Sequence, residues 1–344
     1  MKIAFLDPVE GIARELITQH FSPDDLLIAP TREELPADLS TAEAVVWSRW
    51  PVDRALIDSM PHLRLLQRLG RFRARGDATA AFERGIAISV LPHGTSGRVA
   101  EHVLALIIGV FRALLRSDQA VREGHNPAGL EPQERIGSTP TVNWARVPGL
   151  ESLYFKTVGI AGFGEIGACL ALLLQPFGCR VLYNKRTPLS PALERYFGVT
   201  HASFEAVLTT SDAVVDLVPV SDATRGMFGR RQFQSMKPSA IFINTGRGPT
   251  TDENALVDVL RERRIAGAGL DVFALEPLPP GHPLTRLDNV LLTPHTAGGT
   301  PQGPVNGIAG WTDTFVRLKE NIRRVEAGEP VLSPMRPGDP QPGG

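Results

Sequence analysis

Short apolar runs alternate with segments of helical character along almost the whole chain of 344 residues. Each run has the length of a strand, whereas the segments between the runs carry apolar residues at helical spacing. This alternation predicts parallel sheets whose strands are joined by crossover helices. Because the alternation occurs in two blocks, we expect an α/β protein with two doubly wound domains of the Rossmann-like or flavodoxin-like kind.

The first block contains five predicted strands and ends in a long helix. The strands are expected at residues 2–7, 26–30, 44–50, 63–70 and 86–92. From Gly97 to about residue 124, apolar residues recur at helical spacing, which predicts one helix of about eight turns leading out of the block. The polar stretch 125–151 contains Pro and Gly and lacks periodicity, so a long surface loop is expected there.

The second block contains six predicted strands, which is the number in a complete dinucleotide-binding sheet. They are expected at residues 157–163, 180–184, 213–219, 240–246, 266–273 and 289–294. Helical character returns over 300–327, in a segment long enough to cross back and cover the first block. We therefore expect residues 1–97 plus 301–332 to form one domain, residues 98–300 to form an inserted dinucleotide-binding domain, and residues 333–344 to be a disordered tail.

Composition excludes several classes of function. The formal net charge is −1 and no long basic run occurs, so we expect no nucleic-acid partner. No apolar stretch reaches the roughly 18 residues of a membrane span, and the first residues read as a strand rather than a signal peptide. We therefore expect a cytoplasmic protein without membrane association. Cys169 and Cys179 flank an apolar helical segment, so they are expected to pack in the interior, and no metal site is expected.

A Gly-rich turn follows the first strand of the second block and precedes a helix. Gly162 permits a tight turn, Gly164 permits the backbone to approach a pyrophosphate, and Gly167 permits helix and strand to pack closely. A bare pattern of this kind can also consist of packing glycines, but its place between strand and helix favours a dinucleotide site. The predicted cofactor contacts are Gly162, Phe163, Gly164, Glu165, Ile166 and Gly167.

The end of the next strand bears on which dinucleotide is preferred. An acid that would bond the ribose 2′-hydroxyl of NAD is missing there, and Lys185 and Arg186 stand in its place. Cationic donors suit a 2′-phosphate, so the sequence favours NADP(H), with NAD(H) still possible. The alternative is that both side chains are merely solvated at a strand end.

Three residues suited to acid/base and anion chemistry follow the last three predicted strands. Arg247, Glu276 and His295 should converge, because ligands bind outside the carboxyl ends of parallel strands. His295 can donate a proton to a carbonyl that receives a hydride, and Glu276 can orient the imidazole and favour its charged form. Arg247 can bind a carboxylate or polarise the carbonyl with its planar donors.

The chain resembles the D-isomer-specific 2-hydroxyacid dehydrogenase family, in particular its glyoxylate/hydroxypyruvate reductases. The resemblance is carried by VAEHVLALIIG (99–109), TVGIAGFGEIG (157–167), NTGRGPTTDENAL (244–256), GLDVFALEPLP (269–279) and TPHTAG (293–298). It implies Arg247 as the substrate-binding arginine, Glu276 as the carboxylate and His295 as the acid/base. It also implies that Asp271 faces the nicotinamide amide and that a homodimer forms through the cofactor domains. By the same resemblance, residues 1–97 plus 301–332 are a split substrate domain that closes by hinge motion, and residues 98–300 are the NAD(P)-binding Rossmann domain. The further cofactor-lining residues that it implies are Pro219, Thr245 and Gly298.

One region departs from the family pattern. Where the family has a small, Gly-rich loop for the substrate carboxylate, this chain has Arg71, Phe72 and Arg73, followed by Arg75. One or more of these arginines could face the cleft and recognise a second anionic group on the substrate. The alternative is that they are solvated or paired with neighbouring acids.

The predicted activity is NAD(P)H-dependent interconversion of a 2-oxo acid and a D-2-hydroxy acid. Two alternatives remain: a dinucleotide-sensing, corepressor-like protein on the same fold, and an enzyme that oxidises another anion such as phosphite. The sequence leaves the roles of His93 and His102 open.

Overall fold

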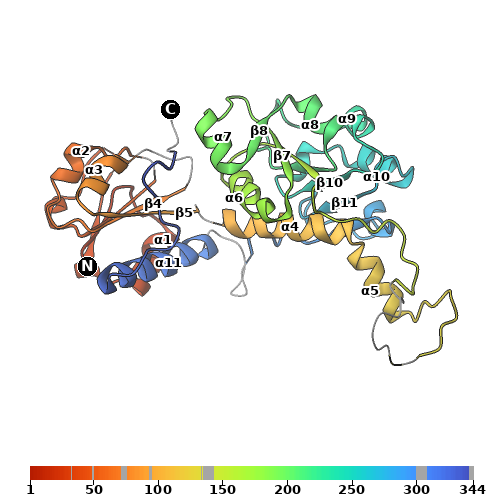
Figure 1. The fold of residues 1–344 in the computed structure, drawn as a ribbon, viewed down its shortest axis with the longest axis horizontal. Coiled ribbons are helices and arrows are strands. Elements are labelled where there is room, and N and C mark those ends of the chain that lie inside the picture. The colour runs from red at the N-terminus through yellow and green to blue at the C-terminus, as the bar shows by residue number, and fades with distance from the viewer. Residues whose placement is uncertain are drawn as a thin grey trace.

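In the computed structural model the chain forms two parallel sheets, each covered by helices on both faces (Figure 1). The residues that the structure describes are 1–31, 33–48, 50–70, 76–92, 95–132, 134, 143–299 and 308–340, and the side chains of 12 and 308–310 fall outside this description. Within these ranges no helix combines the length and apolar character that a membrane crossing requires.

The first sheet has the strand order β2-β1-β3-β4-β5 and is parallel throughout. All five expected strands are present. They are β1 (Ile3–Phe5), β2 (Leu26–Ile28), β3 (Ala44–Trp47), β4 (Leu65–Leu69) and β5 (Ala87–Leu91). Side chains alternate between the two faces, so two separate cores form. One core contains α2 (Arg54–Asp58) and α3 (Ala78–Glu83), and the other contains α1 (Ile12–His20) and α11 (Ile308–Ala327).

The second sheet has seven strands in the order β12-β11-β10-β9-β6-β7-β8. They are β6 (Thr157–Ala161), β7 (Arg180–Asn184), β8 (Val199–His201), β9 (Ala213–Asp216), β10 (Ile241–Asn244), β11 (Gly267–Leu270) and β12 (Val290–Leu292). One face packs against α4 (Ser96–Phe111), α6 (Glu165–Leu174) and α7 (Pro191–Phe197). The other face packs against α8 (Phe204–Thr210), α9 (Arg230–Ser235) and α10 (Glu253–Arg261). The strand order reverses between β6 and β9, which creates the crevice where such sheets bind ligands.

The second sheet differs from the sequence prediction in one strand. The prediction of six strands omitted β8, an edge strand of three residues that pairs with β7. Its sequence, Val-Thr-His, is too short and too polar to show a strand pattern. β8 lies at the edge of the sheet beyond β7, whereas Arg247, Glu276 and His295 follow β10, β11 and β12 on the other side of β6. The extra strand therefore does not change the predicted placement of these three residues.

The long connecting helix is also interrupted. The chain forms α4 and then α5 (Leu114–Arg122), with Ala113 between them in a left-handed conformation at φ 46°. Ala113 is buried in a small cluster with Ala145 and Val147 from the loop that follows. The break depends on contacts with residues 145–147, which lie outside the helical segment. Periodicity within the segment therefore predicted one continuous helix.

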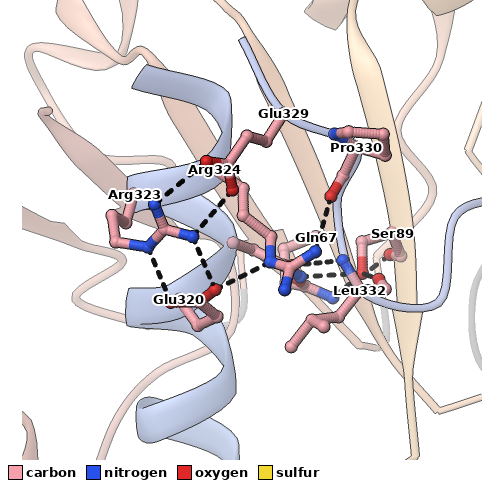
Figure 2. A network of polar contacts seen from close by, with 9 residues as sticks. Gln67, Ser89, Glu320, Arg323, Arg324, Glu329, Pro330 and Leu332 are labelled. Atoms are coloured by element: carbon pink, nitrogen blue, oxygen red, sulfur yellow. Dashed lines mark hydrogen bonds and ion pairs between the residues drawn. The ribbon is translucent and has the colours of Figure 1, made fainter. Parts of the chain in front are cut away.

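The C-terminal segment returns to the first sheet through a buried polar network (Figure 2). The amide of Asn321 on α11 donates to Gln67 Oε1 at 2.7 Å and to Ser89 Oγ at 3.0 Å. Its carbonyl oxygen accepts from the backbone N–H of Leu332 at 2.6 Å, and Ser89 Oγ donates to the carbonyl of Leu332 at 2.7 Å. The expected covering of the first sheet by this helix is thus present.

The tail beyond α11 is partly ordered, contrary to the expectation of disorder from residue 333. Met335 donates its backbone N–H to Ile88 at 2.9 Å, and Val90 donates to Ser333 at 3.1 Å. Met335 also packs against the core under α2 and α3. Pairing with β5 orders these residues, a long-range effect that Pro and Gly content does not reveal. The limits proposed for the two domains stay a prediction.

Candidate functional site

The Gly-rich turn connects β6 to the N-terminus of α6, and two of its glycines are required by their surroundings. Gly162 has φ 86°, and a Cβ there would lie 2.7 Å from the carbonyl carbon of Leu217. A Cβ on Gly167 would lie 3.1 Å from ring atom Cδ2 of Phe163, so the helix packs closely at this point. A Cβ on Gly164, the N-cap of α6, would enter open space. The turn therefore leaves room for an anion at the helix N-terminus.

The turn residues differ in what their side chains can contact. Phe163 is buried, with its ring centroid 4.8 Å from that of Tyr183 and 6.1 Å from that of Phe197, so its side chain belongs to the core. Glu165 and Ile166 are partly exposed on the first turn of α6. Phe163 can therefore face a cofactor through its backbone but not through its side chain, whereas the side chains of Glu165 and Ile166 can contribute directly.

Other residues predicted to line a dinucleotide surround the crevice. Pro219 is exposed two residues beyond Leu217, and a Cβ on Gly298 would lie 3.3 Å from Thr95 Oγ1. Thr245, directly after β10, is 6% exposed, and its hydroxyl has no hydrogen-bond partner among the described residues. A buried hydroxyl without a partner fits a site that a polar ligand completes. The crevice therefore fits a dinucleotide.

Lys185 and Arg186 follow β7 at the far side of the same crevice. Arg186 is exposed, and partial burial lowers the pKa of the Lys185 ammonium from its ordinary value. The carbonyl of Lys185 lies 3.3 Å from His201 Nε2 at the end of β8. The segment is thus anchored through its backbone while Arg186 extends into solvent.

Arg247 precedes the short 3-10 helix η4 (Gly248–Thr250) and is exposed. Its Nη1 donates to the carbonyl of Gly246 at 2.6 Å, and its own carbonyl accepts from Asn244 Nδ2 at 3.2 Å. Gly248 lies directly against the backbone of Phe273, so the Arg247 segment touches the segment that carries Glu276. A side chain at position 248 would separate these two segments.

Glu276 and His295 form the pair that the sequence predicts. Glu276 Oε2 lies 2.6 Å from His295 Nδ1, and Glu276 Oε1 accepts the backbone N–H of Phe273 at 2.9 Å. Both side chains are partly open to solvent, at 33% and 47% exposure. Because Nδ1 is engaged, Nε2 of His295 is the nitrogen available to a substrate. The described contacts do not include one between Arg247 and this pair.

Asp271 holds the loop that carries His295. Its Oδ1 accepts from Thr293 Oγ1 at 2.6 Å and from the backbone N–H of Thr296 at 2.8 Å, and its Oδ2 accepts from Ala297 N–H at 2.9 Å. These bonds surround His295, whose φ of 53° is unusual for a non-glycine residue. The loop thus depends on one buried carboxylate.

His102 on α4 completes this arrangement, which answers the question that the sequence left open for it. Its Nε2 lies 3.0 Å from Thr293 Oγ1 and 3.4 Å from Asp271 Oδ1. Burial opposes ionisation of Asp271, but the hydrogen bonds from His102, Thr293 and the loop amides outweigh it and lower the pKa of this carboxyl. Asp271, predicted to face the nicotinamide amide, is fully buried here, and that role stays a prediction.

An open cavity of about 500 Å³ lies beside the Glu276–His295 pair. Its other walls are mostly apolar and comprise Phe273, Pro277, Leu278, Leu292, Thr293 and Pro294. Proton-transfer groups therefore border a space large enough for a small organic acid.

Some predicted residues lie outside the described part of the chain. They are Arg71, Phe72, Arg73, Arg75 and His93. The substrate contacts proposed for the loop 71–75 stay predictions, and the role of His93 stays open. Sequence reasoning also missed Asp216, a buried acid at the end of β9. The one available signal was a charged residue inside the otherwise apolar run 213–219.

Comparison with known proteins agrees with this geometry. Residues 104–297 match the family profile described as "D-isomer specific 2-hydroxyacid dehydrogenase, NAD binding domain". The chain is 34% identical over 313 residues to glyoxylate/hydroxypyruvate reductase B of Yersinia pestis (strain Pestoides F), covering 89% of this chain and 91% of the relative.

Two solved structures share the fold over almost the full length. A D-isomer-specific 2-hydroxyacid dehydrogenase of Xanthobacter autotrophicus Py2, in complex with NADPH and MES, is 28% identical with a TM-score of 0.53, covering 97% of this chain and 98% of that one. An NADPH-dependent glyoxylate/hydroxypyruvate reductase of Sinorhizobium meliloti, in complex with citrate, is 26% identical with a TM-score of 0.52, covering 97% of both chains. Such relatives favour neither the sensing alternative nor the phosphite alternative.

Proposed function

Since the chain belongs to the D-isomer-specific 2-hydroxyacid dehydrogenase family, we propose that His295, Glu276 and Arg247 carry out its reaction. The protein is an NAD(P)H-dependent oxidoreductase that interconverts 2-oxo and 2-hydroxy acids. The observation that supports the assignment of roles is the 2.6 Å contact between Glu276 Oε2 and His295 Nδ1 beside an open cavity.

The chemistry follows from the free nitrogen of the imidazole. When bound, the reduced nicotinamide supplies a hydride to C2 of the 2-oxo acid. Protonated His295 donates the proton on Nε2 to the carbonyl oxygen, so the C=O double bond becomes a C–O single bond, new C–H and O–H bonds form, and the imidazole becomes neutral. Glu276 stabilises the imidazolium before the transfer and fixes the ring orientation. Arg247 binds the substrate carboxylate through its guanidinium.

Replacement of His295 tests this assignment. His295→Ala is expected to lower kcat for glyoxylate or hydroxypyruvate reduction by about 10²- to 10⁴-fold, because general acid catalysis is lost. Binding of NADPH, followed by its fluorescence, should be nearly unchanged. His62→Ala is the matched control, since His62 is exposed on the first domain's surface. Near-normal turnover of His295→Ala would refute the role of the imidazole.

We propose NADP(H) as the preferred cofactor, with Lys185 and Arg186 as the residues that select it. The support is the absence of an acid after β7 and the exposed guanidinium of Arg186. Replacing both with Ala should weaken NADPH binding by about tenfold or more and leave NADH binding nearly unchanged, since only NADPH carries the 2′-phosphate. Arg180→Ala, at the opposite end of β7, is the control. A wild-type preference for NADH in kcat/KM would contradict the proposal.

We also propose a homodimer formed through the cofactor domains. Several apolar side chains on and after the α4–α5 connection are solvent-exposed in the single chain: Leu114 at 53%, Leu115 at 43% and Val121 at 60%. Clustered exposure of this kind is typical of a protein interface. Sedimentation equilibrium of the full chain measures the mass directly, and a monomer at micromolar concentration would contradict the dimer.

A further inference from the structure

A buried acid that the reaction does not use lies beneath the crevice. Asp216 is the last residue of β9 and has no exposed surface. In the sheet it is in register with Ala161 at the end of β6 and with Asn244 at the end of β10. It therefore lies where the strand order reverses, between the Gly-rich turn and the Arg247 segment.

The hydrogen bonds of Asp216 connect it to the carbonyl of Arg247. Oδ1 accepts the backbone N–H of Val218 at 2.9 Å, and Oδ2 lies 2.5 Å from Thr250 Oγ1. The same Thr250 oxygen lies 2.6 Å from the carbonyl oxygen of Arg247. Thr250 Oγ1 is thus within hydrogen-bond distance of two oxygens.

Counting protons decides which form of Asp216 fits these distances. A hydroxyl carries one proton, so with an ionised Asp216 the carboxylate and the Arg247 carbonyl compete for it. With a protonated Asp216, the carboxyl O–H donates to Thr250 Oγ1, and the Thr250 hydroxyl donates to the Arg247 carbonyl. Both short contacts then have a proton between their oxygens.

The surroundings of the carboxyl also favour its neutral form. Its described neighbours, Ala161, Asn244, Val218 and Thr250, are uncharged. Burial raises the pKa of Asp216 to about 7, against the opposing effect of the hydrogen bonds from Thr250 and Val218. A buried carboxyl without a cationic partner is expected to behave in this way.

We propose that Asp216 is a positioning residue for Arg247 and that it acts in its protonated form. Ionisation would redirect the Thr250 proton to the carboxylate and leave two oxygens 2.6 Å apart without a proton between them. The Arg247 segment must then shift, which weakens binding of the substrate carboxylate. The inference rests on the proposed role of Arg247 in substrate binding.

The test compares the pH dependence of KM in the wild type and in Asp216→Asn. The amide imitates the neutral acid at every pH, because Nδ2 can donate to Thr250 Oγ1 while Oδ1 still accepts from Val218. Wild-type KM for glyoxylate should rise about fivefold more than that of the variant between about pH 6 and about pH 8. The other ionisable residues of the site, His295, Glu276 and Asp271, are common to both proteins, so their effects cancel in the ratio. Identical KM profiles would overturn the proposal.

Two further variants separate positioning from folding. Thr250→Val removes the hydroxyl and should raise KM at every pH, whereas Thr250→Ser retains it and should behave as the wild type. If both Thr250 variants had the same KM, the connection from Asp216 to Arg247 would be refuted. A pH-difference infrared spectrum of the wild type should also show the band of a protonated carboxyl group near neutral pH, and Asp216→Asn should lack this band. A wild-type spectrum without the band would also overturn the proposal.

Arg247→Ala distinguishes failure of this inference from failure of the proposed function. If KM is unchanged in Arg247→Ala, Arg247 does not bind substrate and the proposed role of this residue is wrong. If KM rises in Arg247→Ala while wild type and Asp216→Asn share one pH profile, only the positioning by Asp216 is wrong.

Discussion

The two ends of β9 bear acids in opposite environments. Asp212, just before the strand, accepts from Lys237 Nζ at 2.8 Å and from the backbone N–H of Thr157 at 2.8 Å. Partial burial opposes its ionisation, but these donors outweigh burial and lower the pKa of Asp212. At the other end, burial raises the pKa of Asp216 to about 7. The two acids should therefore change stability with pH in opposite directions.

For Asp216 the folded protein binds a proton more tightly than the unfolded chain, whose carboxyl has the ordinary value of 3.8. The contribution of Asp216 to stability is then complete below about pH 4 and lost as the pH rises to about 7. Asp216→Asn should thus gain stability relative to the wild type as pH rises, by up to about 4 kcal/mol. Urea unfolding at several pH values measures this difference.

Asp212→Asn is the matched control with the opposite sign. A lowered carboxyl pKa stabilises the folded state above the ordinary pKa, and this stabilisation is lost as pH falls through the folded value. The variant should therefore be less stable than the wild type at neutral pH, and the deficit should shrink in acid. A stability difference for Asp216→Asn that does not vary with pH would contradict the raised pKa.

The local pattern of apolar residues predicted most of the helices and strands. It failed where contacts with residues remote in sequence determine the conformation. The five strands of the first sheet and six of the second are apolar runs that a buried parallel sheet requires. The edge strand β8, the break at Ala113 and the ordered Ser333–Met335 segment all depend on contacts with residues remote in sequence. Propensity within a short window contains no information on such contacts.

The same distinction applies to the site. Glu276 and His295 each follow a predicted strand, and neighbouring parallel strands place their carboxyl ends at one edge of the sheet. The sequence therefore predicted that the two residues come together, as the structure shows. The role of His102 could not be predicted, since it depends on how α4 crosses the loop at Thr293. Asp216 was missed for a related reason: its partner Thr250 is 34 residues away and becomes a neighbour only when β9 and β10 pair.

The attachment of α11 to the first sheet gives a prediction about an element. Asn321 is fully buried and bonds Gln67, Ser89 and the Leu332 backbone. Asn321→Ala should lower the free energy of unfolding by about 2 to 3 kcal/mol, because several buried polar groups lose a partner. Limited proteolysis should then cut the chain after α11 more readily.

An exposed ion-pair network on the same helix provides the control. Arg323 bonds Glu320 at 2.9 Å and Glu329 at 2.8 Å and is 53% exposed (Figure 2). Arg323→Ala should lower the free energy of unfolding far less than Asn321→Ala does, since solvent screens such exposed pairs. Equal losses in the two variants would mean that the buried network is not what holds α11.

The chain passes between the two sheets twice, and Arg98 forms hydrogen bonds that join these two connecting segments. Arg98, in the first turn of α4, bonds Asp313 on α11 through Nε at 2.5 Å and Nη2 at 2.6 Å. Its Nη1 also donates to the carbonyl of Gly299 at 2.9 Å. Both side chains are partly buried, so this bidentate pair is shielded from solvent more than a surface pair. The pair thus joins the start of α4 to α11, which belong to the two segments that connect the sheets.

Removing this pair should affect substrate more than cofactor. The proposed dinucleotide residues lie on the second sheet alone, whereas the predicted split substrate domain would contact substrate only if both domains are held at the right distance. Arg98→Ala should therefore raise KM for glyoxylate about tenfold and leave the Kd for NADPH nearly unchanged. Asp313→Ala should have the same effect, and the double variant should be no worse than either single one, because each change breaks the same pair. Additive effects in this double-mutant cycle, or a matching loss of NADPH affinity, would show that the pair does not set the relative placement of the two sheets.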